Sequence, residues 1–267
     1  MGRIEAAFNE IRREGKPGFI PFITAGDPDL ETTAELLVEL ANAGASVIEL
    51  GVPFSDPMAD GPVIQRASER ALRHGFGLPE IFATTSAVRA RIETPLVLFS
   101  YFNPLLQYGV DKLARDARQA GIDGILVTDL TPEESQEFAA ALKLNELDMI
   151  FLVAPTSTDD RLRLISGHAS GFVYAVSRAG VTGARENLSS EAELLVARVR
   201  KFSSLPVAVG FGISSAEQVA QTLEYADAAV VGSAIVAQIE KLSGSPELVN
   251  EVGQYVRSLI SAGAKTA

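Results

Sequence analysis

The sequence contains no cysteine and no tryptophan, and only two of its 267 residues are histidines. The lack of thiols excludes disulfides, zinc–thiolate sites, iron–sulfur clusters and a cysteine nucleophile. No third histidine accompanies His74 and His168, so we expect no bound metal ion. A Ser–His–Asp hydrolase motif is also missing. Any chemistry of the chain must therefore rest on other side chains.

Positive charge is scarce as well. The 23 lysines and arginines stand against 34 aspartates and glutamates, which gives a formal net charge of −11 at pH 7. Because a protein that binds nucleic acid normally presents a basic face, we expect no nucleic-acid partner. No stretch approaches the roughly 18 apolar residues of a membrane helix, and the N-terminus lacks a signal-peptide run. We therefore expect a soluble cytoplasmic protein without a membrane partner.

What the sequence does have is a large apolar fraction, 47%, without a linker or a low-complexity tract. We therefore expect one domain over residues 1–267. Short apolar runs recur along it, and most are continuous rather than alternating, which is typical of parallel strands covered on both faces. The eight runs are Phe19–Thr24, Ser46–Leu50, Leu96–Ser100, Gly124–Thr128, Met149–Val153, Gly171–Val176, Pro206–Gly210 and Ala228–Val231.

Helical patterns separate the strand-like runs. Leu30–Ala43 places its leucines on one face. Pro132–Leu142 is predicted to begin with Thr131 as the N-cap and a proline at the first helical position. Ser214–Leu223 begins with a serine that is followed three residues later by Glu217, as in a capping box. Strand and helix signals therefore alternate along the chain.

Eight strands joined by helical crossovers predict an α/β fold, a closed (β/α)8 TIM barrel. We expect extra helices at three places. One lies at the N-terminus, striped by Ile4, Phe8 and Ile11 and covering the lower end of the barrel; one lies in the long loop-2 interval before Leu96; and one lies at the C-terminus, over Leu248–Ile260. An open doubly wound sheet is the alternative, although no G-x-G-x-x-G follows the first strand, which counts against its dinucleotide-binding version.

Glu49 lies inside an apolar strand, SVIELG, toward the end where the active sites of such barrels lie. Strand alternation places Val47 on the same face as Glu49, and we expect that face to point into the barrel mouth. A half-desolvated glutamate has a raised pKa and can serve as both general acid and general base near neutral pH. A structural glutamate paired with an arginine is the alternative.

Two further acids, Asp56 and Asp60, lie in the loop PFSDPMADGP. Three prolines and two acids within ten residues suit a shaped functional loop. The alternative is turn chemistry, because Asp-Pro and Asp-Gly are common turn pairs.

Three glycine-rich segments, GVTGA, GFGIS and GSAIV, follow the last three strands. Backbone N–H groups exposed by glycine at helix N-termini hold phosphate, and the last two loops of barrels are a frequent phosphate site. We predict phosphate ligands at Gly183, Gly212, Gly232 and Ser233, with ordinary capping and tight turning as the alternative. From its residues alone, the chain is interpreted as a barrel enzyme that uses carboxylate acid–base chemistry on a phosphorylated substrate, without metal.

Other side chains are candidates that the sequence does not settle. Asp129 can reach the site or bond loop backbone, and Arg178 can approach a phosphate or pair with an acid. Several apolar side chains can line a pocket, although each taken singly suits the core equally well. They are Phe22, Ile64, Phe99, Tyr101, Leu126, Tyr174 and Phe211.

A resemblance to a known family covers most of the chain, in order from about Phe19 to Val236. The segments that carry it are PFITAGDPD, VIELGVPFSDPMADGPVIQ, SYFNP, SRAGVTGAR, VGFGIS and VVGSAIV, which are similar to those of the tryptophan synthase alpha subunit. The second segment is the most specific, because it contains both Glu49 and Asp60 at the family's separation. The chain is therefore identified as a member of this family.

The resemblance implies a carbon–carbon lyase that cleaves indole-3-glycerol phosphate to indole and glyceraldehyde 3-phosphate by a retro-aldol reaction. Glu49 matches the residue that acts as acid and base, and Asp60 matches the carboxylate that stabilises positive charge at the indole N–H. Both Asp60 and Thr182 lie on loops that close over substrate in the family, and Phe99 lies where some members have a smaller residue. The matching phosphate positions are Gly183, Gly212, Gly232 and Ser233, and the matching pocket positions are Phe22, Tyr101, Leu126, Tyr174, Thr182 and Phe211.

The family partner is a beta subunit in an α2β2 heterotetramer, and the resemblance implies that pyridoxal phosphate is bound only by that partner. This chain is therefore expected to bind no cofactor. The expected docking rim lies around Val52–Met58 and SYFNPLLQYG, with Asp56 as an interface residue. In a plant the expected compartment is the plastid stroma.

Three other functions remain open on the sequence. The nearest is a stand-alone indole-3-glycerol-phosphate lyase, which shares these motifs and releases free indole. Another is a different phosphate barrel, such as a sugar-phosphate isomerase, although Glu49 and Asp60 argue against it. The third is a non-catalytic activator of a partner, which does not need intact catalytic acids.

Overall fold

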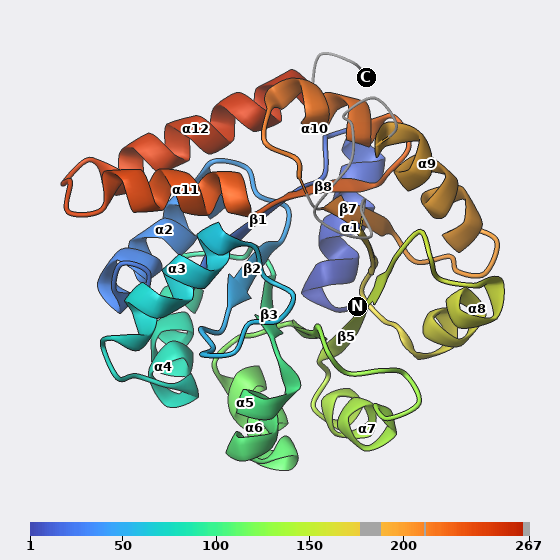
Figure 1. Cartoon of the computed structure of the whole chain (residues 1–267), viewed down its shortest axis with the longest axis horizontal. Coiled ribbons are helices and arrows are strands. Elements are labelled where there is room, and N and C mark those ends of the chain that lie inside the picture. Colours follow the sequence, from blue (N-terminus) through green and yellow to red (C-terminus); the bar gives the residue numbers. More distant parts are fainter. Residues whose placement is uncertain (177–187, 211, 264–267) are drawn as a thin grey trace.

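The computed structural model describes residues 1–176, 188–210 and 212–263. Within these ranges eight parallel strands close into a barrel in sequence order, which confirms the predicted (β/α)8 fold (Figure 1). Strand ends differ from the prediction by two residues at most; for example, β2 begins at Ile48 and β6 at Val173. The strands are β1 (Phe19–Thr24), β2 (Ile48–Gly51), β3 (Leu96–Ser100), β4 (Gly124–Val127), β5 (Asp148–Val153), β6 (Val173–Val176), β7 (Val207–Gly210) and β8 (Ala228–Val231).

Helices surround the strands on the outside of the barrel (Figure 1). No helix in the described ranges is both long enough and apolar enough to cross a membrane. The helices are α1 (Arg3–Glu14), α2 (Leu30–Asn42), α3 (Pro62–Leu72), α4 (Leu78–Arg89), α5 (Phe102–Tyr108), α6 (Val110–Gln119), α7 (Gln136–Leu144), α8 (Asp159–His168), α9 (Leu188–Val199), α10 (Ala216–Leu223), α11 (Ser233–Leu242) and α12 (Leu248–Gly263).

The strands separate two hydrophobic cores. Val47 packs inside the barrel with Val97 and other inward residues, whereas Ile48 and Leu50 pack outward against the helices. The predicted alternation around Glu49 is therefore confirmed, and the inner face of β2 is the one that carries its carboxylate. Both faces of each strand are buried, which is why the strand sequences are continuous apolar runs.

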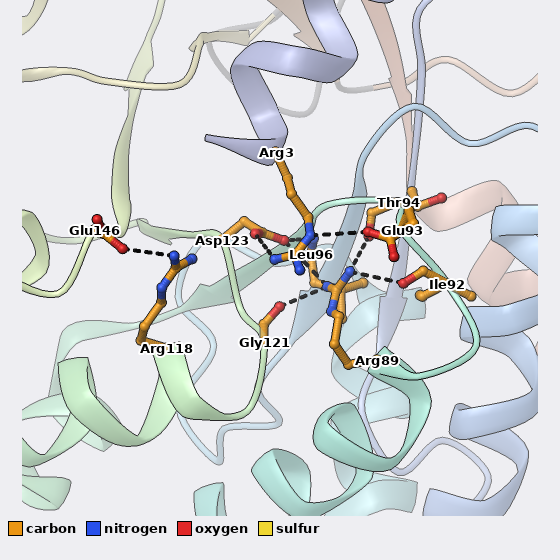
Figure 2. Close-up of polar contacts among 10 residues, drawn as sticks. All are labelled: Arg3, Arg89, Ile92, Glu93, Thr94, Leu96, Arg118, Gly121, Asp123 and Glu146. Atoms are coloured by element: carbon orange, nitrogen blue, oxygen red, sulfur yellow. Dashed lines mark hydrogen bonds and ion pairs between the residues drawn. The ribbon is translucent and has the colours of Figure 1, made fainter. Parts of the chain in front are cut away.

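Helix α1 closes the amino-terminal end of the barrel, as predicted. Ile4 and Phe8 are buried in the interior core, and the Phe8 ring lies 5.6 Å from that of Phe172. An ion pair between Arg3 and Asp123 anchors the start of this helix to the residue that precedes β4 (Figure 2). The other end of the barrel is therefore the one left open to ligands.

The predicted extra helices are also present. Helices α3 and α4 fill the long interval between β2 and β3. Helix α12 packs across α10 and α2 on the outer surface of the ring (Figure 1). Its apolar stripe explains the contact, because Leu248, Val252 and Val256 are buried there.

Two predicted helix starts were wrong. The helix expected from Pro132 begins at Gln136, because the Ser135 hydroxyl and backbone N–H both bond the Pro132 carbonyl in a preceding turn. The Thr131 hydroxyl contacts Glu134 and caps no backbone group. The capping box of α10 also lies one residue later than predicted, with Ser215 and Gln218 as its members. Hydrogen bonds made by nearby side chains set both helix starts. Sequence patterns locate helix ends poorly.

Candidate active site

A cavity of about 340 Å³ opens at the carboxyl ends of the strands. Strands β1, β2, β3, β6 and β8 contribute side chains to its wall, and the loops after β2, β7 and β8 contribute the rest together with the first turns of α3 and α11. This is the end at which barrel enzymes carry their active sites. The lining residues are Phe22, Glu49, Ala59, Asp60, Gly61, Ile64, Phe99, Tyr174, Gly212, Ile213, Ser214, Val230, Gly232, Ser233 and Ala234.

Glu49 is almost completely buried, with 1% of its surface exposed. Its strand pairs with β1 at Phe22 and with β3 at Val97, so the carboxyl is held on rigid backbone. No group among the described residues bonds its Oε1 atom. Burial raises the pKa of Glu49 to about 8, because the charged form loses its hydration without gaining a partner. The arginine pairing that the sequence left open is not found in the described part of the chain.

Asp60 stands where loop 2 meets α3, which starts with Gly61 as N-cap and Pro62 at its first position. Loop 2 is anchored to Tyr101, because the Ala59 N–H donates to the Tyr101 hydroxyl at 2.9 Å. Burial raises the pKa of Asp60 to about 6, and a hydrogen bond from Tyr101 opposes part of that rise.

The two carboxyls therefore have different charges near pH 7. Glu49, with a pKa of about 8, is mostly protonated, whereas Asp60, with a pKa of about 6, is mostly ionised. Two carboxyl groups with separated pKa values in one cavity suit an acid–base residue beside a fixed negative charge.

Aromatic rings form the apolar wall of the cavity. The Phe22 and Phe99 rings meet edge to face with centroids 5.3 Å apart. Glycines make room for these rings: a Cβ at Gly51 would lie 2.5 Å from Phe22 Cζ, and a Cβ at Gly210 would lie 2.1 Å from the Tyr174 hydroxyl oxygen. The cavity thus has a flat apolar surface beside its two acids.

The helices that follow β7 and β8 reach the cavity with different N-termini. In α10 the N-terminus is capped by its own side chains, since Gln218 Oε1 accepts from the Ser214 and Ser215 N–H groups. In α11 the N-cap is Gly232, which has no side chain to bond the first turn. Since Gly232 and Ser233 line the cavity, the positive end of α11 is available to an anionic group.

An ion-pair network that sequence reasoning missed holds the loop after β1 against α3 and α11. Arg70 contacts the buried Asp27 at 2.7 Å and Glu240 at 2.7 Å. Arg66 also pairs with Glu240 at 2.7 Å. The helix that follows Asp60 is thereby tied to the helix whose N-terminus lines the cavity. Asp27 in TAGDPD, which follows an apolar strand, was the signal in the sequence that could have indicated this network.

The remaining predicted site residues lie in several places. Leu126 is fully buried in the interior core, and Tyr101 lies behind Asp60 rather than in the wall of the main cavity. Asp56 is exposed on loop 2. Asp129 accepts a hydrogen bond from the Phe102 N–H at 2.7 Å, which is the loop-bonding role. The predictions at Arg178, Thr182, Gly183 and Phe211 lie outside the described residues.

Several lining residues were not predicted. Val230 lies two positions before Gly232, so strand alternation was a sufficient signal for it. Ile213, Ser214 and Ala234 lie within two residues of the predicted Gly212 and Gly232, so their position beside those glycines was the available signal. Gly212 adopts a φ of +80°, which explains why glycine stands there.

The histidines do not gather at the cavity. His74 bonds the Pro28 carbonyl at 2.7 Å, and His168 bonds the Leu164 carbonyl at 2.8 Å. In the part of the chain that the structure describes, no group of three or more His, Cys, Asp or Glu side chains could hold a metal ion.

Comparison with known proteins agrees with this geometry. The family model for the tryptophan synthase alpha chain matches residues 8–263. The tryptophan synthase alpha chain of Geotalea daltonii is 48% identical over 259 residues, which cover 97% of this chain and 98% of that protein.

Solved structures extend the agreement to the fold. The tryptophan synthase alpha subunit of Legionella pneumophila superposes with a TM-score of 0.92 at 37% identity, over 99% of each chain. A chain of the tryptophan synthase α2β2 complex from Pyrococcus furiosus superposes with a TM-score of 0.85 at 40% identity, over 91% of this chain and 98% of that one. Matches in sequence and fold thus extend over nearly the full length, and the chain belongs to the tryptophan synthase alpha chain family.

Proposed function

We propose that this chain cleaves indole-3-glycerol phosphate to indole and glyceraldehyde 3-phosphate by a metal-independent retro-aldol reaction. Membership of the family implies lyase activity on this substrate. The observation that carries the proposed mechanism is the unpaired, buried Glu49 carboxyl in one cavity with the more acidic Asp60.

In the first step Glu49 acts as the general acid. Its protonated carboxyl gives a proton to indole C3, which turns the ring into a cationic indolenine. The ionised Asp60 accepts a hydrogen bond from the ring N–H and stabilises that positive charge as it develops. The apolar wall of Phe22 and Phe99 keeps water from the ring and strengthens the interaction.

In the second step Glu49 acts as the general base. The bond between indole C3 and the adjoining glycerol carbon breaks, and its electron pair restores the neutral indole. The hydroxyl on that carbon becomes the aldehyde and gives its proton to the Glu49 carboxylate. Glu49 thus ends protonated, as it began, and a pKa of about 8 lets it serve in both directions near neutral pH.

The phosphate of the substrate is proposed to bind at the N-terminus of α11. Gly232 and Ser233 present backbone N–H groups there, and Gly212 lies in the same wall. Gly183, which lies outside the described residues, is proposed as a further ligand. Support comes from the absence of a side-chain cap on α11, because a phosphate would supply the missing acceptor.

The proposed partner is a tryptophan synthase beta subunit in an α2β2 heterotetramer. The similar structure from Pyrococcus furiosus is that of a tryptophan synthase α2β2 complex. On this chain, loop 2 presents Asp56 and the exposed Met58, 87% of whose surface is accessible, as an apolar and acidic rim beside the cavity. We propose that pyridoxal phosphate is bound by the partner and that indole passes directly to it. The bacterial relatives support a cytoplasmic location for both subunits.

The test is the release of indole from indole-3-glycerol phosphate by the purified chain, with and without a beta subunit. Slow turnover that rises strongly when the partner is added is the expected result. Fast turnover that the partner leaves unchanged would identify a stand-alone lyase. The absence of indole in both mixtures would refute the proposed reaction.

A further inference from the structure

A second, much smaller cavity lies behind Asp60. Its volume is about 10 Å³, which matches the space that one water molecule occupies. Asp60, Phe22, Ile64 and Phe99 line both this cavity and the larger one, so these side chains form the partition. The small cavity is therefore a second space beside Asp60, separate from the one proposed to hold the substrate.

Thr24 supplies an unusual polar group to this small cavity. The residue ends β1, is 2% exposed and pairs in register with Gly51. Its hydroxyl oxygen has no hydrogen-bond partner among the described residues. Other buried threonines are satisfied: Thr33 donates to the Asp29 carbonyl, and Thr85 donates to the Phe82 carbonyl. Because an unsatisfied buried hydroxyl is costly, the free Thr24 group needs a partner in the cavity that it lines.

We propose that the Thr24 hydroxyl and the Asp60 carboxylate share one bound water molecule in this cavity, which makes Thr24 a positioning residue for Asp60. Buried waters typically make about three hydrogen bonds. Ser68 and Tyr101 also line the cavity and supply further polar groups. The inference rests on the charge-stabilising role proposed above for Asp60.

The bound water acts on Asp60 by favouring its ionised form. A water that donates to a carboxylate stabilises the charge, which burial disfavours. The titratable groups that line the two cavities with Asp60 are Glu49, Tyr101 and Tyr174. In the described structure Thr24 lines the small cavity and Glu49 the large one, so the water affects Asp60 without contacting the acid–base residue.

The experiment compares Thr24→Val, which keeps the shape and removes the hydroxyl, with Thr24→Ser, which keeps the hydroxyl. Thr85→Val is the matched control, a buried threonine on α4 away from the site. The pH dependence of kcat/KM for indole release is measured with the beta subunit present. Thr24→Val is expected to move the acidic limb upward by about one pH unit, the effect of one lost hydrogen bond to a charged group. The alkaline limb and both other variants are expected to match the wild type.

High-resolution crystal structures of the wild-type chain and the two Thr24 variants provide a readout that does not depend on activity. An ordered water that bonds Thr24 and Asp60 in the wild type, remains with serine and is lost with valine supports the inference. A dry cavity in the wild type overturns it even if Thr24→Val fails to fold, and so does an unchanged acidic limb in a folded Thr24→Val. A wild-type chain that releases no indole refutes the proposed reaction instead, while the structures still decide whether the water is bound.

Discussion

Two carboxylates, Asp123 and Glu49, are almost completely buried at opposite ends of the barrel, but only Asp123 is paired in the described structure. Its Oδ1 atom accepts from Arg3 at 3.0 Å, and its Oδ2 atom accepts from Arg89 at 3.3 Å and from the Leu96 N–H at 3.0 Å. Figure 2 shows the two arginines reaching it from different helices, α1 and α4. Glu49 has only burial acting on its pKa, which rises to about 8.

The difference shows how the fold divides stability from chemistry. Three donors compensate the desolvation of Asp123, so this carboxylate can hold α1 and α4 to the strands. Glu49 has no such donors among the described residues, so its desolvation appears as a raised affinity for a proton. An active site at the carboxyl ends of the strands can tolerate this cost because residues at the other end of the barrel, such as Asp123, contribute to stability.

The larger cavity lies at the end of the barrel that carries the paired Asp123, so cavity size alone does not identify the active site. A hollow of about 1190 Å³ lies beside Asp123 under α1, much larger than the 340 Å³ cavity at Glu49. Its lining mixes acids and bases, including Arg12, Lys143 and Asp148, and Asp123 itself is already paired. The smaller cavity is the stronger candidate because it joins an unpaired acid to an apolar wall and an uncapped helix N-terminus.

The largest effect is expected at the unpaired carboxyl. Glu49→Gln should lower kcat about 10³- to 10⁴-fold, because the amide can neither donate the proton to C3 nor take it from the hydroxyl. Affinity for an unreactive substrate analogue should remain close to that of the wild type. Stopped assays of indole release and analogue titrations measure the two quantities. Turnover at the wild-type level would exclude the acid–base role.

The paired carboxyl should show the opposite pattern. Asp123→Ala should lower the free energy of unfolding by about 3–5 kcal/mol, since it leaves two arginines without their buried partner. The kcat of the folded enzyme should not change. Urea unfolding and indole release check the two halves of this prediction. Glu93→Gln is the control: its carboxylate also contacts Arg3, but its side chain is exposed, so the loss should be below about 1 kcal/mol. Equal losses in both variants would contradict the contrast.

Asp60 is intermediate between the unpaired Glu49 and the paired Asp123, because a hydrogen bond from Tyr101 offsets part of the rise in pKa that burial causes. Asp60→Asn should lower kcat about 100-fold through the lost charge at the indolenine, with little change in KM. Steady-state kinetics with the beta subunit present separate the two parameters. An effect confined to KM would indicate a binding role in place of charge stabilisation.

The smallest effect, taken per pH unit, is the contribution of the Glu49 carboxyl to the pH dependence of stability. Between pH 4.5 and about 8 the unfolded chain has lost the Glu49 proton and the folded chain retains it, so stability falls as pH rises. Relative to Glu49→Gln, the wild type should lose up to about 1.4 kcal/mol per pH unit across this window. Urea unfolding of both proteins at several pH values measures the difference. Parallel curves would show that Glu49 is not protonated in the folded state.

Much of the fold was predictable because burial on both faces leaves continuous apolar runs, such as Leu96–Ser100, which has the same bounds as β3. The position of Glu49 in the cavity followed from alternation with Val47, the residue just before β2. Helix starts were less predictable. Pro132 looked like a first helical residue, but the Ser135 side chain and backbone favoured a turn before the helix.

Residues whose roles depend on distant partners were not predictable. Arg70 meets Asp27 across 43 positions and Glu240 across 170, and no local pattern connects them. Leu126, a predicted pocket residue, is buried in the interior core and is not among the residues that line the 340 Å³ cavity, so its role in the pocket stays a prediction. A side chain at a strand end can face the core or the cavity with a shift of very few residues, so its role depends on register.

By itself, the sequence determined the number and order of the strands, their alternation with helices, the acids near the barrel mouth and the exclusion of thiol chemistry. These features depend on residue type and on periodicity along the chain, which are local properties. Only the tertiary structure decided that, among the described residues, Asp123 is paired while Glu49 is not, that α10 is capped by its own side chains while α11 is not, and that Thr24 shares a small cavity with Asp60. Burial and partner distance set hydrogen bonding and pKa, and neither exists until residues far apart in sequence have packed together.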